Sequence, residues 1–297
     1  MGVVIFKNHR PHDQQIALKE IIMNHLPQTL HKLPLIALVG TVLFTQAVWA
    51  DTWKCEIPKV TEYDHVSCLS EGLAWVRKGN KYGFIDTAGQ VVVPLQYDGT
   101  WGFNEGLASV RQDAQWGFIN TTGKVVIDLQ YDDARLFSEG LAAVKKDNQW
   151  KYIDKTGKVV INLPYELTYG FSEGLAVVNR GDKWGFIDKT GKAVIPLQYD
   201  KVWSFEEGLA MVKKDGKWGF IDTTGKVVIP FQYDLTYGFS EGLARVEKDG
   251  KVGFINKTGD IAIPLQYDDA GGFKEVFAEV NKADEWFYIN KQGQRVD

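Results

Sequence analysis

The segment KWGFIDKTGK, Lys183–Lys192, recurs almost unchanged 34 residues later as KWGFIDTTGK, Lys217–Lys226. The glycine of the GFI triplet falls at Gly83, Gly117, Gly185, Gly219 and Gly253. Two divergent copies, KYIDKTG from Lys151 and FYINKQG from Phe287, lie in the same frame. Self-similarity at a fixed period of this length indicates a repeated structural unit, whereas an active site would need only one copy.

Two other markers keep the same period. The sequence EGLA begins at Glu71, Glu105, Glu139, Glu173, Glu207 and Glu241, and a divergent form, EVFA, begins at Glu275. A tyrosine followed by Asp or Glu falls at Tyr63, Tyr97, Tyr131, Tyr165, Tyr199, Tyr233 and Tyr267. Residues 61–297 are therefore predicted to form seven repeats within one all-β domain.

Each repeat predicts three β-strands joined by tight turns. The alternating segment GLAVV, Gly174–Val178, predicts a half-buried strand, and its variable third position predicts an outer face that tolerates any side chain. The pair Asp215-Gly216 is a strong hairpin signal, and the aromatic segment that follows it favours a second strand. In the next turn, DKTG, the Asp side chain can accept hydrogen bonds from the backbone of its own turn, and the Gly supplies a positive φ.

The remainder of each repeat is less regular. The segment VVIP, Val227–Pro230, is apolar at successive positions and predicts a third strand that is buried on both faces. Proline ends this strand because it lacks the donor for a further ladder hydrogen bond. The segment from Tyr-Asp to Phe, such as Tyr199–Phe205, predicts either a short fourth strand or a turn.

The combination KWGFID.TGK, VIP.QYD and F.EGLA.V resembles the WG repeat family, also called KWG repeats, over all seven units. The resemblance implies a bacterial β-repeat domain of a kind often found in exported or cell-envelope proteins, with no established general activity. This sequence departs from the motif at Tyr82 and Val252, which replace its Trp, and at Lys151 and Phe287, which replace its Gly. Those departures predict altered local geometry in their units.

Repeats of this size must stack, because one unit cannot bury its own apolar face. The stack could be an open β-solenoid or a propeller-like closed ring. The last repeat stops short of its VIP segment, and CEIPKV, Cys55–Val60, precedes the first Tyr-Asp. A strand from this N-terminal segment could complete the last unit and close the ring, so the chain ends favour closure.

The first fifty residues predict a secretory signal peptide, residues 1–50. The apolar run Leu33–Phe44 is too short to span a bilayer, and Val48 and Ala50 fit the −3 and −1 positions of a cleavage site. Translation from Met23 would give a signal of more usual length. The mature chain would start at Asp51, with residues 51–60 as an N-terminal strand or cap, and no second hydrophobic span follows. The protein is therefore predicted to be periplasmic or secreted.

Both cysteines, Cys55 and Cys68, lie near the start of the predicted mature chain. Two nearby cysteines in an oxidising compartment usually pair. A disulfide between them is predicted.

Composition argues against several functions. The formal charge of −4 gives no strongly basic face, so a nucleic-acid partner is not expected. Four of the five histidines precede the predicted cleavage site, which leaves only His65 in the mature chain. A catalytic triad would have to use that one residue, and no metal site could have two imidazole ligands. We therefore expect no catalytic residues, no cofactor and no metal.

Carboxylates are abundant, but they recur in every repeat. A glycosidase pair needs two unequal environments, which seven equivalent sites do not readily provide. Glu71, Asp64 and their counterparts are expected to accept hydrogen bonds from turn backbone, with calcium binding at such a turn as the alternative.

One repeat position is variable and yet aromatic four times. Two residues before the repeat Phe, the frame holds Ser67, Trp101, Arg135, Tyr169, Trp203, Tyr237 and Gly271. Trp and Tyr at variable positions are typical of recognition surfaces, although they could also pack between adjacent units. Trp101, Tyr169, Trp203 and Tyr237 are the candidate binding surface.

The function predicted from these features is a non-enzymatic binding or scaffolding protein for a protein or glycan of the cell envelope. The alternatives are a structural envelope component without a discrete ligand and a carboxylate-dependent hydrolase. The sequence does not define the oligomeric state.

Overall fold

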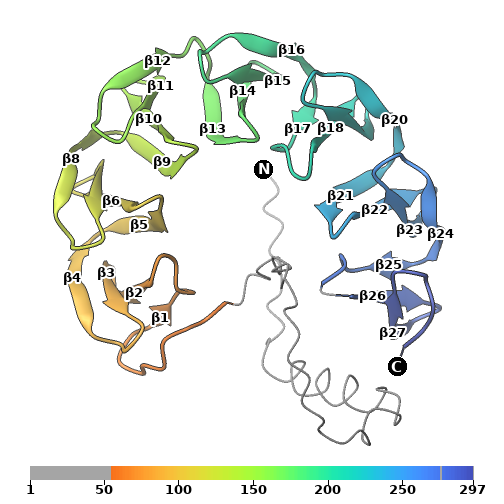
Figure 1. Ribbon diagram of the computed structural model, residues 1–297, viewed down its shortest axis with the longest axis horizontal. Helices are drawn as coiled ribbons and strands as arrows, with labels where there is room; N and C mark the ends of the chain where they lie inside the picture. The colour runs from red at the N-terminus through yellow and green to blue at the C-terminus, as the bar shows by residue number, and fades with distance from the viewer. Residues whose placement is uncertain (1–54, 275, 297) are drawn as a thin grey trace, which may run out of the picture. The chain divides into compact units, whose positions relative to one another are not determined.

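The sheets follow the sequence repeat. The computed structural model describes residues 55–274 and 276–296, in which seven antiparallel sheets succeed one another along the chain (Figure 1). Six sheets have four strands and the last, β25–β27, has three. Sheets of this kind in series are the blades of a propeller-like fold. The predicted all-β class and the seven repeats are confirmed, whereas the predicted signal peptide and Asp51 lie outside the described residues.

Within each sheet the strands pair in chain order. The first strands are β1 (His65–Val66), β5 (Gly99–Asn104), β9 (Asp133–Ser138), β13 (Leu167–Ser172), β17 (Lys201–Val202), β21 (Leu235–Ser240) and β25 (Asp269–Ala270). The second strands are β2 (Leu73–Lys78), β6 (Leu107–Gln112), β10 (Leu141–Lys146), β14 (Leu175–Arg180), β18 (Leu209–Lys214), β22 (Leu243–Lys248) and β26 (Phe277–Lys282).

The third strands are β3 (Lys81–Asp86), β7 (Gln115–Asn120), β11 (Gln149–Ile153), β15 (Lys183–Asp188), β19 (Lys217–Asp222), β23 (Lys251–Asn256) and β27 (Glu285–Asn290). The fourth strands are β4 (Val91–Tyr97), β8 (Val125–Tyr131), β12 (Val159–Asn162), β16 (Ala193–Tyr199), β20 (Val227–Tyr233) and β24 (Ile261–Tyr267). The segment from Tyr-Asp to Phe is thus a strand, and of the two readings of this segment the turn is wrong.

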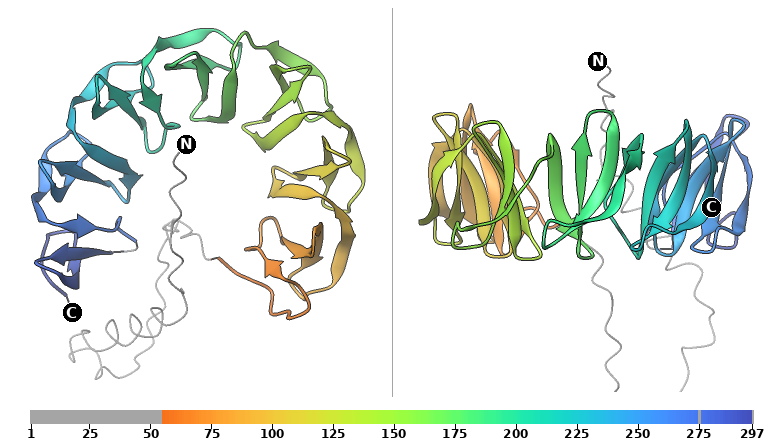
Figure 2. Two further views of the ribbon diagram at one scale, coloured as in Figure 1. Left: turned by 180° about the vertical axis from the view of Figure 1, so that it is seen from behind. Right: turned by 90° about the horizontal axis from the view of Figure 1, so that it is seen from above.

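The apolar core lies between consecutive sheets, which stand side by side in Figure 2. Between the fourth and fifth sheets, Leu175 and Phe186 pack against Val202 and Val212. The ring of Phe186 lies 4.9 Å from that of Phe205 in the next sheet. The same Phe–Phe contact recurs along the chain, so each sheet buries its apolar face only against its neighbour.

In the second to sixth sheets the second strand is buried on both faces, which corrects the prediction of a tolerant outer face. The third position of this strand is fully buried as Ser109 and Ala143, and Arg245 there is 7% exposed. The position faces the next sheet: the backbone of Gly102 in the second sheet lies against Trp75 of the first. The residue at this position varies because it meets different side chains at each junction between sheets. Both faces of an interior strand contact another sheet.

The fourth strand is the exposed edge, which corrects the prediction that it is buried on both faces. In β20, Val227 is exposed whereas Ile229 is fully buried. Ile229 points toward the next sheet, where the turn glycine Gly259 lies against its side chain. The side chains of β20 are therefore exposed, half-buried and buried in turn along the strand.

The motif glycine allows this fourth strand to approach closely. A Cβ added to Gly219 on β19 would lie 3.0 Å from the carbonyl carbon of Pro230, at a register shift between β19 and β20. In the third sheet Lys151 replaces the glycine, and the fourth strand β12 is only four residues long, against seven in β16. A side chain at Lys151 occupies the space that the approaching strand needs, so the predicted change of local geometry is confirmed there. At Tyr82 and Val252 it is wrong, since their strands pair with β4 and β24 in the same register as β19 with β20.

The Glu-Gly turns of the first six sheets are each tied to the next sheet, by a hydrogen bond to a glycine N–H, by a lysine, or by both. The carboxylate of Glu105 accepts a hydrogen bond from the backbone N–H of Gly140 at 3.0 Å, and Lys155 Nζ lies 3.2 Å from the same oxygen. Glu139 repeats both contacts with Gly174 and Lys189. We call this contact the glutamate staple. It offsets the strain of a non-glycine residue held at φ 55°, as Glu105 is.

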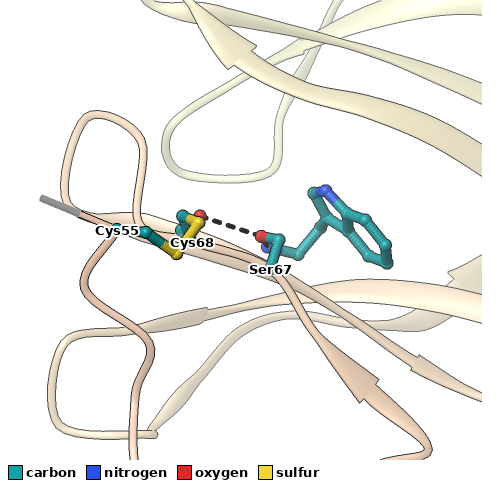
Figure 3. Close-up of a disulfide and its surroundings, with 4 residues drawn as sticks. Cys55, Ser67 and Cys68 are labelled. Atoms are coloured by element: carbon teal, nitrogen blue, oxygen red, sulfur yellow. Dashed lines mark hydrogen bonds between the residues drawn. A yellow bond between two sulfur atoms is a disulfide. The ribbon is translucent and has the colours of Figure 1, made fainter. Parts of the chain in front are cut away.

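Residues 55–60 pack on the first sheet (Figure 3). The predicted disulfide Cys55–Cys68 is present, and Leu69 N–H donates to Glu56 O at 2.8 Å. A side chain on the turn glycine Gly89 would collide with Val60, whereas the equivalent glycine of the second sheet, Gly123, lies against Val93 of the sheet before it. Val60 therefore takes the place of a preceding sheet. The prediction that this segment adds a strand to the last sheet is wrong, since that sheet consists of β25–β27 alone.

Candidate functional site

The four predicted surface aromatics all lie at the first strand of their sheets. Trp101 lies on β5, Tyr169 on β13 and Tyr237 on β21, and Trp203 directly follows β17. Their side chains are 41–57% exposed, which distinguishes them from the core phenylalanines of the same strands. We call these four residues the aromatic row. The first strand of each sheet therefore places these residues at equivalent points of the second, fourth, fifth and sixth sheets (Figure 1).

A second set of rings supports this row, and sequence reasoning did not connect the two. The ring centroids of Trp101 and Trp116 are 6.4 Å apart, and those of Tyr169 and Trp184 are 6.3 Å apart. Trp203 contacts Trp218 at 6.1 Å. The signal for this set was in the sequence, because these are the Trp residues of the WG motif itself. Three of the four exposed rings thus have a less exposed ring of their own sheet beside them.

Arg135 holds the row position in the third sheet and connects its neighbours. Its guanidinium carbon lies 6.0 Å from the ring centroid of Trp101 and 5.7 Å from that of Tyr169. The ring of Trp150 lies 5.5 Å from the same carbon. Trp101, Arg135 and Tyr169 therefore form a stack in which a cation lies among aromatic rings. The repeat alignment places Arg135 at the same position as the aromatic row, but a search for aromatic residues gave no reason to include it in the candidate surface.

Two hollows open at equivalent sheet junctions. One of about 430 Å³ lies between the fourth and fifth sheets, and we call it the Tyr169–Trp203 hollow. It is lined by Tyr169, Val177, Trp184, Asp200, Lys201, Val202, Trp203 and Ser204. The other, of about 360 Å³, is lined by Trp75, Tyr82, Asp98, Gly99, Thr100, Trp101, Arg111 and Trp116. Trp101 and Trp203 belong to these hollows, whereas Tyr237 lines neither.

The carboxylates at both hollows are ionised and already paired. Lys183 Nζ lies 2.7 Å from Asp200 Oδ1, and Lys81 makes the same contact with Asp98. The hydrogen bond from Lys183 holds the pKa of Asp200 below its usual range, with help from hairpin backbone N–H groups. A carboxylate in this state is a poor proton donor. The geometry suits stacking and charge recognition more than acid–base chemistry.

The recurring carboxylates have the structural role that the sequence predicted. The glutamates form the staples described above, and Asp98 Oδ2 accepts from the N–H of Asp113 in the hairpin turn at 3.0 Å. Within residues 55–274 and 276–296, no group of three or more His, Cys, Asp or Glu side chains is arranged to hold a metal ion. The same residues include no helix long and apolar enough to cross a membrane.

Glu206 replaces a serine that, in other repeats, makes a hydrogen bond to the next sheet. The Oγ of Ser172 donates to the carbonyl oxygen of Phe205 in the next sheet at 2.7 Å, and Ser240 does the same with Phe273. Glu206 holds the equivalent position between them. Burial raises the pKa of the Glu206 carboxyl, and the charges of Glu207 and Glu173 raise it further.

We expect Glu206→Gln to stabilise the protein at pH 7 by about 0.5 kcal/mol and to have no effect at pH 3.5. Because folding raises the pKa of Glu206, the contribution of its carboxyl to stability is fully present below the ordinary Glu pKa of about 4.3. That contribution is lost as the pH rises through the pKa of the folded state. Urea unfolding at both pH values measures the difference. Glu207→Gln, which removes the partner of Lys257, is the control and should destabilise at pH 7. A gain from Glu206→Gln that is equal at both pH values would contradict the assignment.

The profile of the WG containing repeat matches residues 61–82, 82–115, 116–150, 152–184, 184–218, 218–251 and 253–286. A solved structure described as "Crystal structure of the eukaryotic initiation factor" superposes with a TM-score of 0.51 at 12% identity, over 76% of this chain and 73% of that chain. "Structure of Kluyveromyces lactis Hsv2p" has a TM-score of 0.41 at 11% identity, over 63% and 72%. At such identities the first likeness concerns the fold alone. No curated protein matches the chain in sequence.

Proposed function

This chain belongs to the family of WG containing repeats, and we propose that it is a non-enzymatic binding protein whose ligand lies along the aromatic row. The observation that carries the proposal is the exposure of Trp101 and Trp203, 53% and 57%, each at the mouth of a hollow. Large exposed aromatic side chains contribute stacking area with little loss of side-chain entropy.

The ligand is an extended one. Trp101 and Trp203 belong to the second and fifth sheets, and Tyr169 and Trp203 line the same hollow. A ligand that contacts several of these rings must cross sheet junctions, as a segment of a partner protein or a polysaccharide would. This binding surface distinguishes the proposal from that of a structural envelope component without a ligand.

We further propose that the protein is exported and acts in the periplasm or outside the cell. Two features support this proposal: the signal-like sequence that ends at Ala50 and the pairing of Cys55 with Cys68. Disulfides persist in oxidising compartments and are rare in the cytosol. The binding partner would then be a protein or glycan of the cell envelope.

The double variant Trp101→Ala/Trp203→Ala tests the binding surface. We expect retention on immobilised cell-envelope extract to fall by about ten-fold or more, because two stacking contacts are lost. The melting temperature should stay within about 2 °C, since more than half of each side chain is already exposed. Trp286→Ala is the matched control: Trp286 is 50% exposed but lines neither hollow. Lower melting with a proportional loss of retention would make these rings packing residues and overturn the proposal.

A further inference from the structure

We propose that the Tyr169–Trp203 hollow binds a guanidinium group, presented by an arginine side chain of a partner protein. This inference rests on the proposed binding function and names the chemistry recognised at one point of the row. Three observations carry it: a guanidinium stacked among rings of the aromatic row elsewhere in the same chain, the distribution of cations over the rings, and the polar groups of the hollow.

The guanidinium stacked elsewhere in the chain is that of Arg135. Its guanidinium lies near three aromatic rings, those of Trp101, Trp150 and Tyr169, at 5.5–6.0 Å. Tyr169 therefore has a cation from the third sheet beside it, and it also lines the hollow toward the fifth sheet. A guanidinium in that hollow would continue the alternation of ring and cation from Tyr169 to Trp203.

The distribution of cations selects this junction. Rings of the aromatic row and of the WG tryptophans in the second to sixth sheets are covered by the chain's own cations: Arg135 over Trp101, Trp150 and Tyr169, Arg111 over Trp116, Lys213 over Trp218, and Arg245 over Tyr237. In these sheets, as the structure describes them, only Trp184 and Trp203 have no such cation. Both of these rings line the 430 Å³ hollow. The repeat thus provides the rings at this junction without the cation that accompanies them elsewhere.

The remaining lining favours a stacked cation over a sugar. A sugar ring is held by several hydrogen bonds in addition to stacking. Asp200 is already engaged by Lys183 and by hairpin N–H groups, Val177 and Val202 are apolar, and Ser204 adds one hydroxyl. Lys201 also lines the hollow, so its charge opposes that of Asp200 and the attraction comes mainly from the rings. A planar guanidinium stacks on rings better than the compact ammonium of lysine.

The test compares two probes that differ only in charge. Acetyl-arginine amide and its neutral isostere acetyl-citrulline amide are titrated into the full chain, with the indole N–H resonances of Trp184 and Trp203 as the readout. We expect the arginine probe to shift both resonances with a Kd in the low millimolar range, and the citrulline probe to bind at least ten-fold more weakly. Lys201→Gln should tighten arginine binding two- to three-fold, because it removes a like charge.

Variants of Trp203 check the site. Trp203→Ala should weaken arginine binding at least ten-fold, Trp203→Tyr should retain most of it, and Trp286→Ala should leave it unchanged. Trp203→Arg copies the third sheet and should abolish probe binding, because the chain then supplies its own guanidinium. Melting temperatures of all four variants establish that they are folded, and Trp203→Tyr keeps the test valid if the alanine variant is not.

Two outcomes would overturn the inference. Equal affinities for the arginine and citrulline probes would show that charge is not recognised. A neutral N-acetylglucosamine trisaccharide that shifts Trp184 and Trp203 at lower concentration than the arginine probe would make the hollow a sugar site. If arginine fails to bind while envelope retention still depends on Trp101 and Trp203, this inference fails and the proposed function stands.

Discussion

Gly185→Ala is expected to lower the free energy of unfolding by about 3 kcal/mol. The added methyl group would lie 2.8 Å from the carbonyl carbon of Pro196, within the backbone of the neighbouring strand β16. Because backbone atoms of a paired strand cannot rotate away as a flexible side chain can, β16 would have to separate from β15. Urea unfolding followed by tryptophan fluorescence measures the loss.

Lys151→Ala is the control for this glycine substitution. Lys151 occupies the same repeat position in the third sheet, where the fourth strand is short and a side chain is already accommodated. We expect a change of less than about 0.5 kcal/mol there. A Gly185→Ala variant as stable as the native chain would show that the close approach of β16 is not what the motif glycine is needed for.

Removal of the disulfide by Cys55→Ala/Cys68→Ala is expected to destabilise the first sheet by about 3 kcal/mol. The bond joins residues 13 positions apart and fixes residues 55–60 against a sheet that has no preceding sheet to pack on. Hydrogen exchange at Ala74 and Val76 in β2 should become roughly a hundred-fold faster.

The sixth sheet provides an internal reference for this experiment, since its contacts do not involve the disulfide. Exchange at Ala244 and Val246 in β22 should be unchanged. Titration of free thiols in the exported protein checks the pairing itself. Two reactive thiols in the absence of reductant would contradict it.

The period, the turns and the strand order of the repeat could be predicted from the sequence because they depend on local chemistry. Asp215 and Gly216 both have positive φ, as the Asp-Gly hairpin signal predicts. Asp188 Oδ1 accepts from Thr190 N–H and Lys192 N–H in the next turn, as its DKTG sequence predicts. These features arise within a few residues, so they do not depend on the neighbouring sheets.

Burial could not be predicted in the same way, because it depends on position in the sheet. The alternation in Leu175–Arg180 is typical of a strand with one free face, yet both faces meet other sheets. The continuous apolar run at Val227–Ile229 is typical of a buried strand, yet it lies at the sheet edge. A sequence pattern records which side chains are apolar, but only the stacking of sheets decides which faces they cover.

The candidate site was predicted in part. Exposure of Trp101, Tyr169, Trp203 and Tyr237 agrees with their variability along the frame. Their alignment with the WG tryptophans and with Arg135 depends on cross-strand and cross-sheet distances, which a linear frame does not contain. Tyr237 differs from the other three because Val252 replaces its tryptophan neighbour and Arg245 lies 5.0 Å from its ring instead.

The glutamate staple gives the chain a direction of assembly. In the first four sheets the carboxylate reaches forward to a backbone N–H in the repeat that follows, 35 residues later, as Glu71 does to Gly106. As an exported chain emerges N-terminus first, every repeat that emerges would therefore meet an acceptor already displayed by the repeat before it. The first repeat has no predecessor, and the disulfide-anchored segment with Val60 fills that place. Chain growth and sheet docking can thus proceed in the same order, without waiting for the C-terminus.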